Sequence, residues 1–186
     1  MLQIQPAGSA AKQRDSIQST SFEQPLELLL SCHEKIIHFS SALYNIAIAV
    51  QQEGWDDNYA LSADQIRRYF NIAGVEHHLD EEQHLFPAIL ALPDKNLDKK
   101  TEISTLIRRM IAEHDETDAQ WLLLDTMLAQ RSEDFITLEK LSRQFKADMH
   151  EHARIENKFI FPYARQYISS TEFKTMGLAI ARRRHQ

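Results

Sequence analysis

Nine histidines are the residues of this sequence best suited to chemistry, and two of them open a repeated pattern. The segment HHLDEEQHLFP, which begins at His77, aligns with HARIENKFIFP, which begins at His152. Both fit H-x-x-x-E-x-x-x-Φ-F-P, where Φ is aliphatic, and the acidic positions are Glu81 and Glu156. Residues four apart lie one above the other on a helix. Each segment therefore presents an imidazole and a carboxylate in one direction.

Two further histidines lie on apolar helical stripes. His33 shares a stripe with Leu29, and His114 shares one with Met110. A buried imidazole without a partner is costly, so helices that direct such groups at a common axis require something that binds them, and a metal ion does. The candidate ligands are His33, His77, Glu81, His114, His152 and Glu156.

This ligand set is too large for one zinc ion, which takes three or four protein ligands. Nitrogen and oxygen donors without sulfur suit two five- or six-coordinate ions bridged by carboxylates in a bundle core. We expect two iron ions, with manganese or a mixed pair as alternatives, joined by an oxo or hydroxo bridge as well as by the carboxylates. With two histidines on each ion, a coordination position stays open for a diatomic molecule or peroxide.

Other polar residues near these positions have alternative interpretations. His78 and Glu82 have the same spacing as the first pair and could be the ligands instead, although the aligned positions of the later segment are alanine and asparagine. His84 could be a base behind the ligands, an entry-channel residue, an extra ligand or a core histidine bound to water. Asp118 and Asp148, each one turn from a candidate ligand, could orient imidazoles or form surface salt bridges.

The elements that must position these residues are helices. Only 4 glycines and 5 prolines occur, too few for the turns of a β-sandwich, a barrel or a Rossmann-like sheet. We expect an all-α, up-down-up-down four-helix bundle with a short C-terminal helix from Ser170, and one domain over residues 25–186 after a mobile arm over 1–24. The expected long helices run from Pro25 to Gly54, Ser62 to Leu92, Asp98 to Gln130 and Glu133 to Ile168.

Pro87 and Pro162 fall at matching places inside two of these helices. Each removes one backbone hydrogen bond, so each should bend or loosen its helix.

Composition excludes several classes of protein. A net charge of −6 disfavours nucleic-acid binding. Cys32 is the only cysteine, which leaves no disulfide, cysteine-type zinc site or iron–sulfur cluster within the chain. The first residues do not show the pattern of a signal peptide, an apolar segment after a basic one, and no apolar run approaches about 18 residues. We therefore expect a cytoplasmic protein without membrane contact. The sequence indicates neither a protein partner nor an oligomeric state.

The two LFP-type blocks, together with the histidines on the first and third helices, resemble the hemerythrin-like, or HHE cation-binding, domain over residues from about 26 to 168. The resemblance implies that the six candidate ligands bind iron and that Glu81 and Glu156 are bridges. Oxygen-carrying hemerythrins have a second histidine on the third helix, whereas this chain has Met110 and Asp118 at the positions one turn from His114. The resemblance therefore does not by itself imply reversible oxygen carriage.

Three classes of function follow from these expectations, and one of them is a structural or regulatory module that senses iron through metal-dependent folding. In the first, the chain is a non-haem di-iron protein that binds or senses O₂, NO or peroxide. In the second, it is a di-iron peroxidase or oxidase, or a protein that donates iron for repair of iron–sulfur clusters. Repair relatives usually carry a cysteine-bearing N-terminal segment, and this N-terminus has no cysteine. We expect a metal- and small-molecule-binding protein rather than an enzyme.

Overall fold

The computed structural model describes residues 22–93 and 97–185, and every regular element in them is helical. The all-α prediction is confirmed, whereas most of the expected arm over 1–24 lies outside the described residues. The helices are α2 (Pro25–Glu53), α3 (Asp57–Tyr69), α4 (Val75–Asp80), α5 (Phe86–Leu90), α6 (Leu97–Ala129), α7 (Phe135–Ile155), α8 (Phe161–Tyr167) and α9 (Ser170–Arg184). Three π-helical turns join some of them: η1 (Phe70–Gly74), η2 (Glu81–Leu85) and η3 (Glu156–Ile160).

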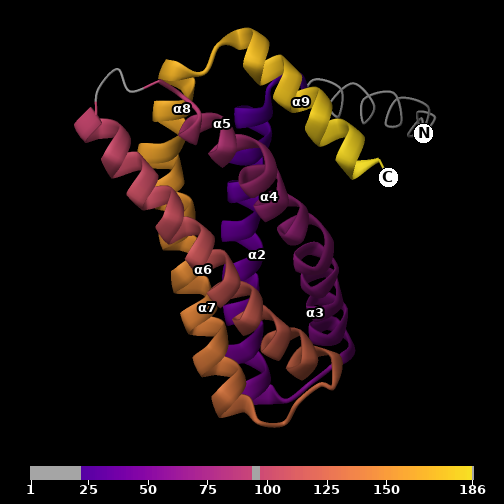
Figure 1. Cartoon of the computed structure of the whole chain (residues 1–186). Coiled ribbons are helices and arrows are strands. Elements are labelled where there is room, and N and C mark those ends of the chain that lie inside the picture. The colour runs from indigo at the N-terminus through magenta and orange to yellow at the C-terminus, as the bar shows by residue number, and fades with distance from the viewer. Residues whose placement is uncertain (1–21, 94–96, 186) are drawn as a thin grey trace, which may run out of the picture.

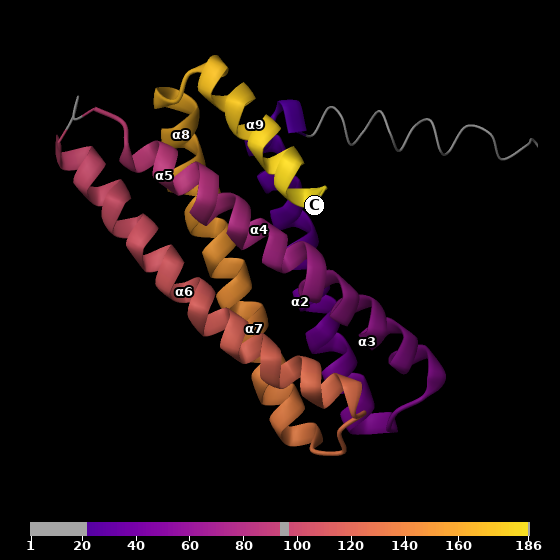
Figure 2. The same cartoon turned by 45° about the vertical axis from the view of Figure 1, so that its right-hand side comes forward.

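The π turns link short helices into longer segments. The chain is helical without interruption from α3 through η1, α4 and η2 to α5, and again from α7 through η3 to α8. These two segments lie side by side with α2 and α6, and α2 packs along α7 (Figures 1 and 2). The C-terminal α9 lies across one end of the molecule, against α2 and η2. None of the described helices has an apolar stretch long enough to span a membrane.

The start of α2 and its end at Gly54 agree with the sequence. Pro25 is the first helical residue, and Gly54 ends the helix with φ +79°, a conformation that glycine adopts without strain. The predicted start at Ser62 is wrong, because α3 already begins at Asp57. The Asp56 carboxylate accepts a hydrogen bond from the Tyr59 amide at 2.7 Å and caps the helix six residues before Ser62.

A similar correction applies to α7. This helix begins at Phe135 rather than Glu133, because the Asp134 side chain accepts from the Thr137 amide at 3.1 Å. Ser132, the residue before the expected start, instead accepts from the Asp134 amide at 3.2 Å. Both errors have one cause. Several side chains near each helix start could accept a hydrogen bond from a backbone amide of the first turn, and the path of the connecting loop decides which one does.

A π turn precedes each of the two internal prolines. The Phe86 amide, just before Pro87, donates to the Glu81 carbonyl five residues back. The Phe161 amide, just before Pro162, donates to Glu156 in the same way. Each π turn thus begins at the glutamate of the repeated pattern. Such turns occur frequently at functional sites because they rotate the side chains that follow.

The apolar core has two parts. One cluster, which includes Leu29, Phe86 and Phe161, lies toward α8 and α9. The other, which includes Ile36 and Phe145, lies toward the opposite end of α2. Between them the helices carry buried polar side chains.

Candidate metal centre

All six candidate ligands meet in the middle of the molecule. They come from α2, α4, η2, α6, α7 and η3, and none is more than 2% exposed. The set consists of His33, His77, Glu81, His114, His152 and Glu156. The structure thus brings together all six side chains, although they lie as far apart in the chain as residues 33 and 156.

Glu81 lies between two groups of imidazoles. Its Oε1 atom is 3.8 Å from His33 Nε2 and 3.4 Å from His77 Nε2. Its Oε2 atom lies 3.6 Å from His114 Nε2. A carboxylate whose two oxygens face different nitrogen donors has the disposition of a bridge between two cations.

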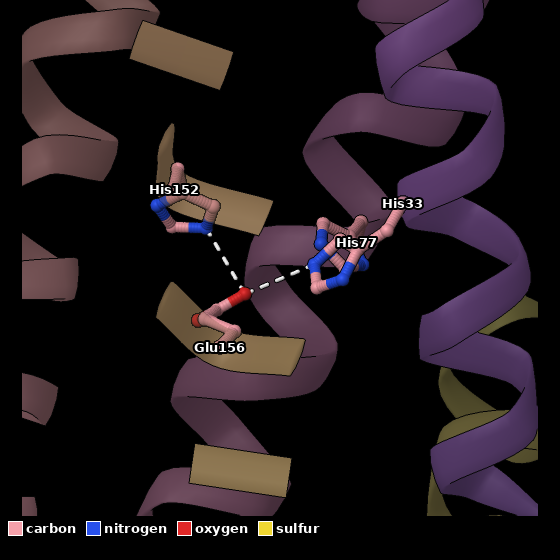
Figure 3. A group of neighbouring side chains, drawn as sticks. All are labelled: His33, His77, His152 and Glu156. Carbon is pink, nitrogen blue, oxygen red and sulfur yellow. Dashed lines mark ion pairs between the residues drawn. The ribbon is translucent and has the colours of Figure 1, made fainter. Parts of the chain in front are cut away.

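Glu156 joins the same groups from η3. Its Oε2 atom is 3.0 Å from His33 Nε2 and 3.1 Å from His152 Nε2, and Figure 3 shows it between these rings, with His77 beside His33. Two overlapping sets of ligand atoms result, each with all its atoms within 4.8 Å of one another. One set contains His33, His77, His152 and Glu156, and the other contains Glu81, His114, His152 and Glu156.

The outer ring nitrogens of two histidines have acceptors behind them. His33 Nδ1 donates to Asn157 Oδ1 and His114 Nδ1 donates to Glu82 Oε1, each at 2.6 Å. Because an amide or carboxylate oxygen can only accept, these rings carry their proton on Nδ1 and turn the Nε2 lone pair toward the centre. Glu82 and Asn157 occupy equivalent positions of the repeat. The alternative that Glu82 is a ligand is therefore not supported by its contacts, since it holds a histidine in place.

Many buried nitrogen and oxygen atoms of the centre lie close to one another. His33 Nε2, both nitrogens of His77 and both carboxylate oxygens of Glu81 and of Glu156 are buried and have no hydrogen-bond partner among the described residues. Lone pairs directed at each other at 3.0–3.8 Å are unfavourable unless a cation, either a proton or a metal ion, lies between them. Neutral imidazoles and carboxylates are also the ligands by which proteins bind iron and manganese. These residues therefore fit a metal centre.

Burial and mutual charge determine how the centre is protonated when it holds no metal. Burial lowers the pKa of His77 well below its usual range and that of His114 to about 2. Burial raises the pKa of Glu81 well above its usual range. Burial would raise the pKa of Glu156, but the adjacent His152 and His33 together outweigh it and lower that pKa. Burial likewise opposes the charge of His152, yet Glu156 and Glu113 raise its pKa to about 9. The metal-free centre thus contains a protonated Glu81 and an imidazolium–carboxylate pair.

Metal affinity is expected to increase with pH, because a cation must displace the protons on Glu81 and His152. His152 keeps its proton below a pH of about 9, so binding should weaken as the pH falls. Each displaced proton gives roughly a tenfold rise in the association constant per pH unit. Titration of the metal-free protein with Mn²⁺ at pH 6.5, 7.5 and 8.5, in buffers of different ionisation enthalpy, measures both the affinity and the protons released. An affinity that does not change with pH would contradict this protonation state.

The orientation of His78 argues against its role as a ligand. One of its nitrogens lies within 4.8 Å of ligand atoms of His114 and His152. However, its ring stacks on His114 with centroids 3.9 Å apart and planes 9° apart. A metal ion lies in the plane of each imidazole that binds it, and two nearly parallel planes do not meet at such an ion. His78 Nδ1 instead lies 3.3 Å from Asp118 Oδ1.

The remaining candidates lie outside the centre. Asp118 contacts His78 rather than His114, and Asp148 accepts hydrogen bonds from Gln120 at 2.9 Å and from Gln144. Neither orients the histidine one turn away, as the sequence had allowed. His84 borders a surface groove against α9.

One buried group was missed by sequence reasoning. Asp80, next to Glu81, is fully buried, and its Oδ1 atom lies 2.5 Å from an Arg183 nitrogen. Arg184 contacts its other oxygen, and Arg183 also pairs with Glu76 at 2.6 Å. The arginines of α9 give no indication of this contact in the sequence, because basic residues are common at the C-terminal end of a helix. A charged residue on the buried face of a helix was the available signal, but its partners lie 103 and 104 residues away.

The fold and the site together define a helical protein with a buried centre of imidazoles and carboxylates for metal ions. Residues 24–164 match the hemerythrin HHE cation binding domain, and the chain belongs to this family. The resemblance recognised in the sequence is thereby confirmed. A similar relative is an uncharacterized protein of Haemophilus influenzae, 25% identical over 167 residues that cover 90% of this chain and 94% of the relative.

Proposed function

We propose that this protein binds two iron ions, with manganese or a mixed pair as alternatives. The observation that carries the proposal is the set of buried acceptor atoms around Glu81 and Glu156, which face one another without hydrogen-bond partners among the described residues. His33 and His77 would hold one ion. His114 and His152, whose Nε2 atoms are 3.4 Å apart, would hold the other, with the two glutamates as bridges. The helices around this centre would form an up-down-up-down four-helix bundle, one domain over residues 25–186.

We further propose that the centre binds or senses a small molecule of the class of O₂, NO or peroxide. Bound iron would supply the capacity to take up such a ligand and to exchange electrons with it. An apolar pocket adjoins the centre, and the four helical segments each contribute to it a residue three positions from a ligand: Ile36, Gly74, Thr117 and Met149. These residues would admit a small uncharged molecule and exclude bulk water. Neither a protein partner nor nucleic acid is part of the proposal.

The metal proposal is tested by metal analysis and absorption spectroscopy of protein purified in air. We expect about two irons per chain and a ligand-to-metal charge-transfer band in the near ultraviolet. One zinc per chain, or no metal after reconstitution with iron, would refute the proposal. Stopped-flow mixing of the reduced protein with O₂, NO and peroxide then distinguishes binding from catalytic turnover, since only turnover consumes ligand beyond the protein concentration.

Removal of the metal is expected to lower the melting temperature by about 5–10 °C. Binding at 100 times the dissociation constant contributes about 2.7 kcal/mol, and each kcal/mol corresponds to roughly 2–4 °C in a domain of this size. The helices themselves should persist without metal, because both apolar clusters lie outside the centre. Thermal unfolding followed by circular dichroism, before and after chelation and again after readdition of iron, measures the change. A melting temperature that chelation leaves unchanged would contradict this expectation.

A further inference from the structure

The pocket beside the metal centre is much larger than a diatomic molecule. Its volume is about 280 Å³, and it lies between the α3–η1–α4 segment and α6. Two of its lining residues, Val75 and Leu122, are 44% and 68% exposed, so the pocket reaches the surface. An apolar cavity of about 150 Å³ is enough to bind benzene. The pocket therefore has room for an organic ring system.

Aromatic rings form much of the wall. Phe70, Trp121 and Phe145 all line the pocket and pack on one another, with ring centroids 4.7 Å apart for Phe70–Trp121 and 5.1 Å apart for Phe70–Phe145. Such a cluster offers ring faces and edges to a further aromatic ring, which gains both buried area and favourable ring geometry.

Several polar groups around the pocket already have hydrogen-bond partners within the protein. The Trp121 indole donates to Asn71 Oδ1 at 2.7 Å, and Asn71 Nδ2 donates to Asp125 Oδ1 at 3.0 Å. The Thr117 hydroxyl donates to the Glu113 carbonyl of its own helix at 2.8 Å. These groups leave few hydrogen bonds for a polar ligand, so the pocket favours an apolar one.

We propose that this pocket is a binding site for a small aromatic molecule of one or two rings, held next to the metal centre. The site is additional to the proposed binding of a diatomic molecule or peroxide, and it does not depend on which metal the protein holds. His78 and Ile36 line the pocket, and each lies within one helical turn of a candidate metal ligand. An aromatic molecule in the pocket would thus lie beside any ligand that reaches the metal.

The test is a ¹⁹F NMR titration of the full chain with fluorobenzene and 1-fluoronaphthalene, with fluoroacetate as a polar comparator. We expect saturable binding of the aromatic probes only, in both the metal-free and the metal-loaded protein. Trp121 fluorescence, measured in a Trp55→Phe background, should change over the same concentration range. The absence of saturable binding, or equal binding of fluoroacetate, would overturn the proposal. Because metal content is measured separately, failure here is distinguishable from failure of the iron proposal.

Two matched variants locate the site. Val75→Phe adds a ring at the pocket wall and should weaken binding of 1-fluoronaphthalene at least about tenfold by filling the space. Ile72→Phe makes a similar change at a 61% exposed residue that does not line the pocket, and should leave binding unchanged. Both positions are exposed enough to accept the ring, and circular dichroism checks the fold. Equal affinity in the two variants would show that the probes bind elsewhere and would overturn the assignment.

Discussion

Replacing Glu156 with alanine is expected to reduce the bound iron from about two ions per chain to fewer than one. The carboxylate is fully buried, and its Oε2 atom lies at 3.0 and 3.1 Å from nitrogens of His33 and His152. In the proposed centre it contacts both ions, so its loss weakens both sites together. It also carries negative charge that offsets the charge of the cations. Metal analysis after reconstitution, together with the near-ultraviolet absorption band, measures the loss.

Two other glutamates serve as controls for this variant. Glu82→Ala removes the acceptor behind His114, a type of change that lowers metal affinity by about 10–100-fold, so excess iron should restore occupancy. Glu151→Ala removes a 47% exposed partner of Arg154 and should leave iron content unchanged. If Glu82→Ala were more damaging than Glu156→Ala, the ligand set would have to shift by one residue along the helix.

Replacing Asp80 with alanine is expected to destabilise the protein by about 3–5 kcal/mol, the usual effect of removing one partner from a buried ion pair. Asp80 is fully buried, whereas Arg183 and Arg184 are 17% and 19% exposed. The substitution leaves two guanidinium groups poorly solvated at the contact between α9 and α4. In a domain of this size the melting temperature should fall by on the order of 10 °C. Thermal and urea unfolding of the metal-free protein measure the change apart from any effect of metal.

Asp64→Ala is the matched control. Asp64 is 45% exposed and also pairs with two arginines, Arg67 and Arg131. Exposed ion pairs contribute about 0–1 kcal/mol, so this variant should unfold within a few degrees of the unaltered protein. Equal losses of stability in Asp64→Ala and Asp80→Ala would contradict this prediction, because they would show that burial does not strengthen the ion pairs of Asp80 with α9.

Much of the centre could be predicted because the helical period is local. Once residues 77–87 and 152–162 are helical, His77 and Glu81 must share a face, and so must His152 and Glu156. Burial follows from the apolar neighbours on the same stripe. The helix starts at Asp57 and Phe135 were not predictable in this way, because Asp56 competes with Ser62, and Asp134 with Ser132, as the capping residue.

The sequence by itself therefore determined that this protein is helical and that it carries two copies of a histidine–carboxylate helix, together with two more histidines on apolar stripes. Tertiary structure decided what surrounds those groups. The contacts of His33 with Asn157 and of Asp80 with Arg183 join residues more than 100 positions apart, and no local periodicity relates such residues. Local periodicity also does not predict the stacking of His78 on His114 or the aromatic pocket between α4 and α6. Their geometry depends on how the helices pack, since packing sets the rotation of each helix about its axis.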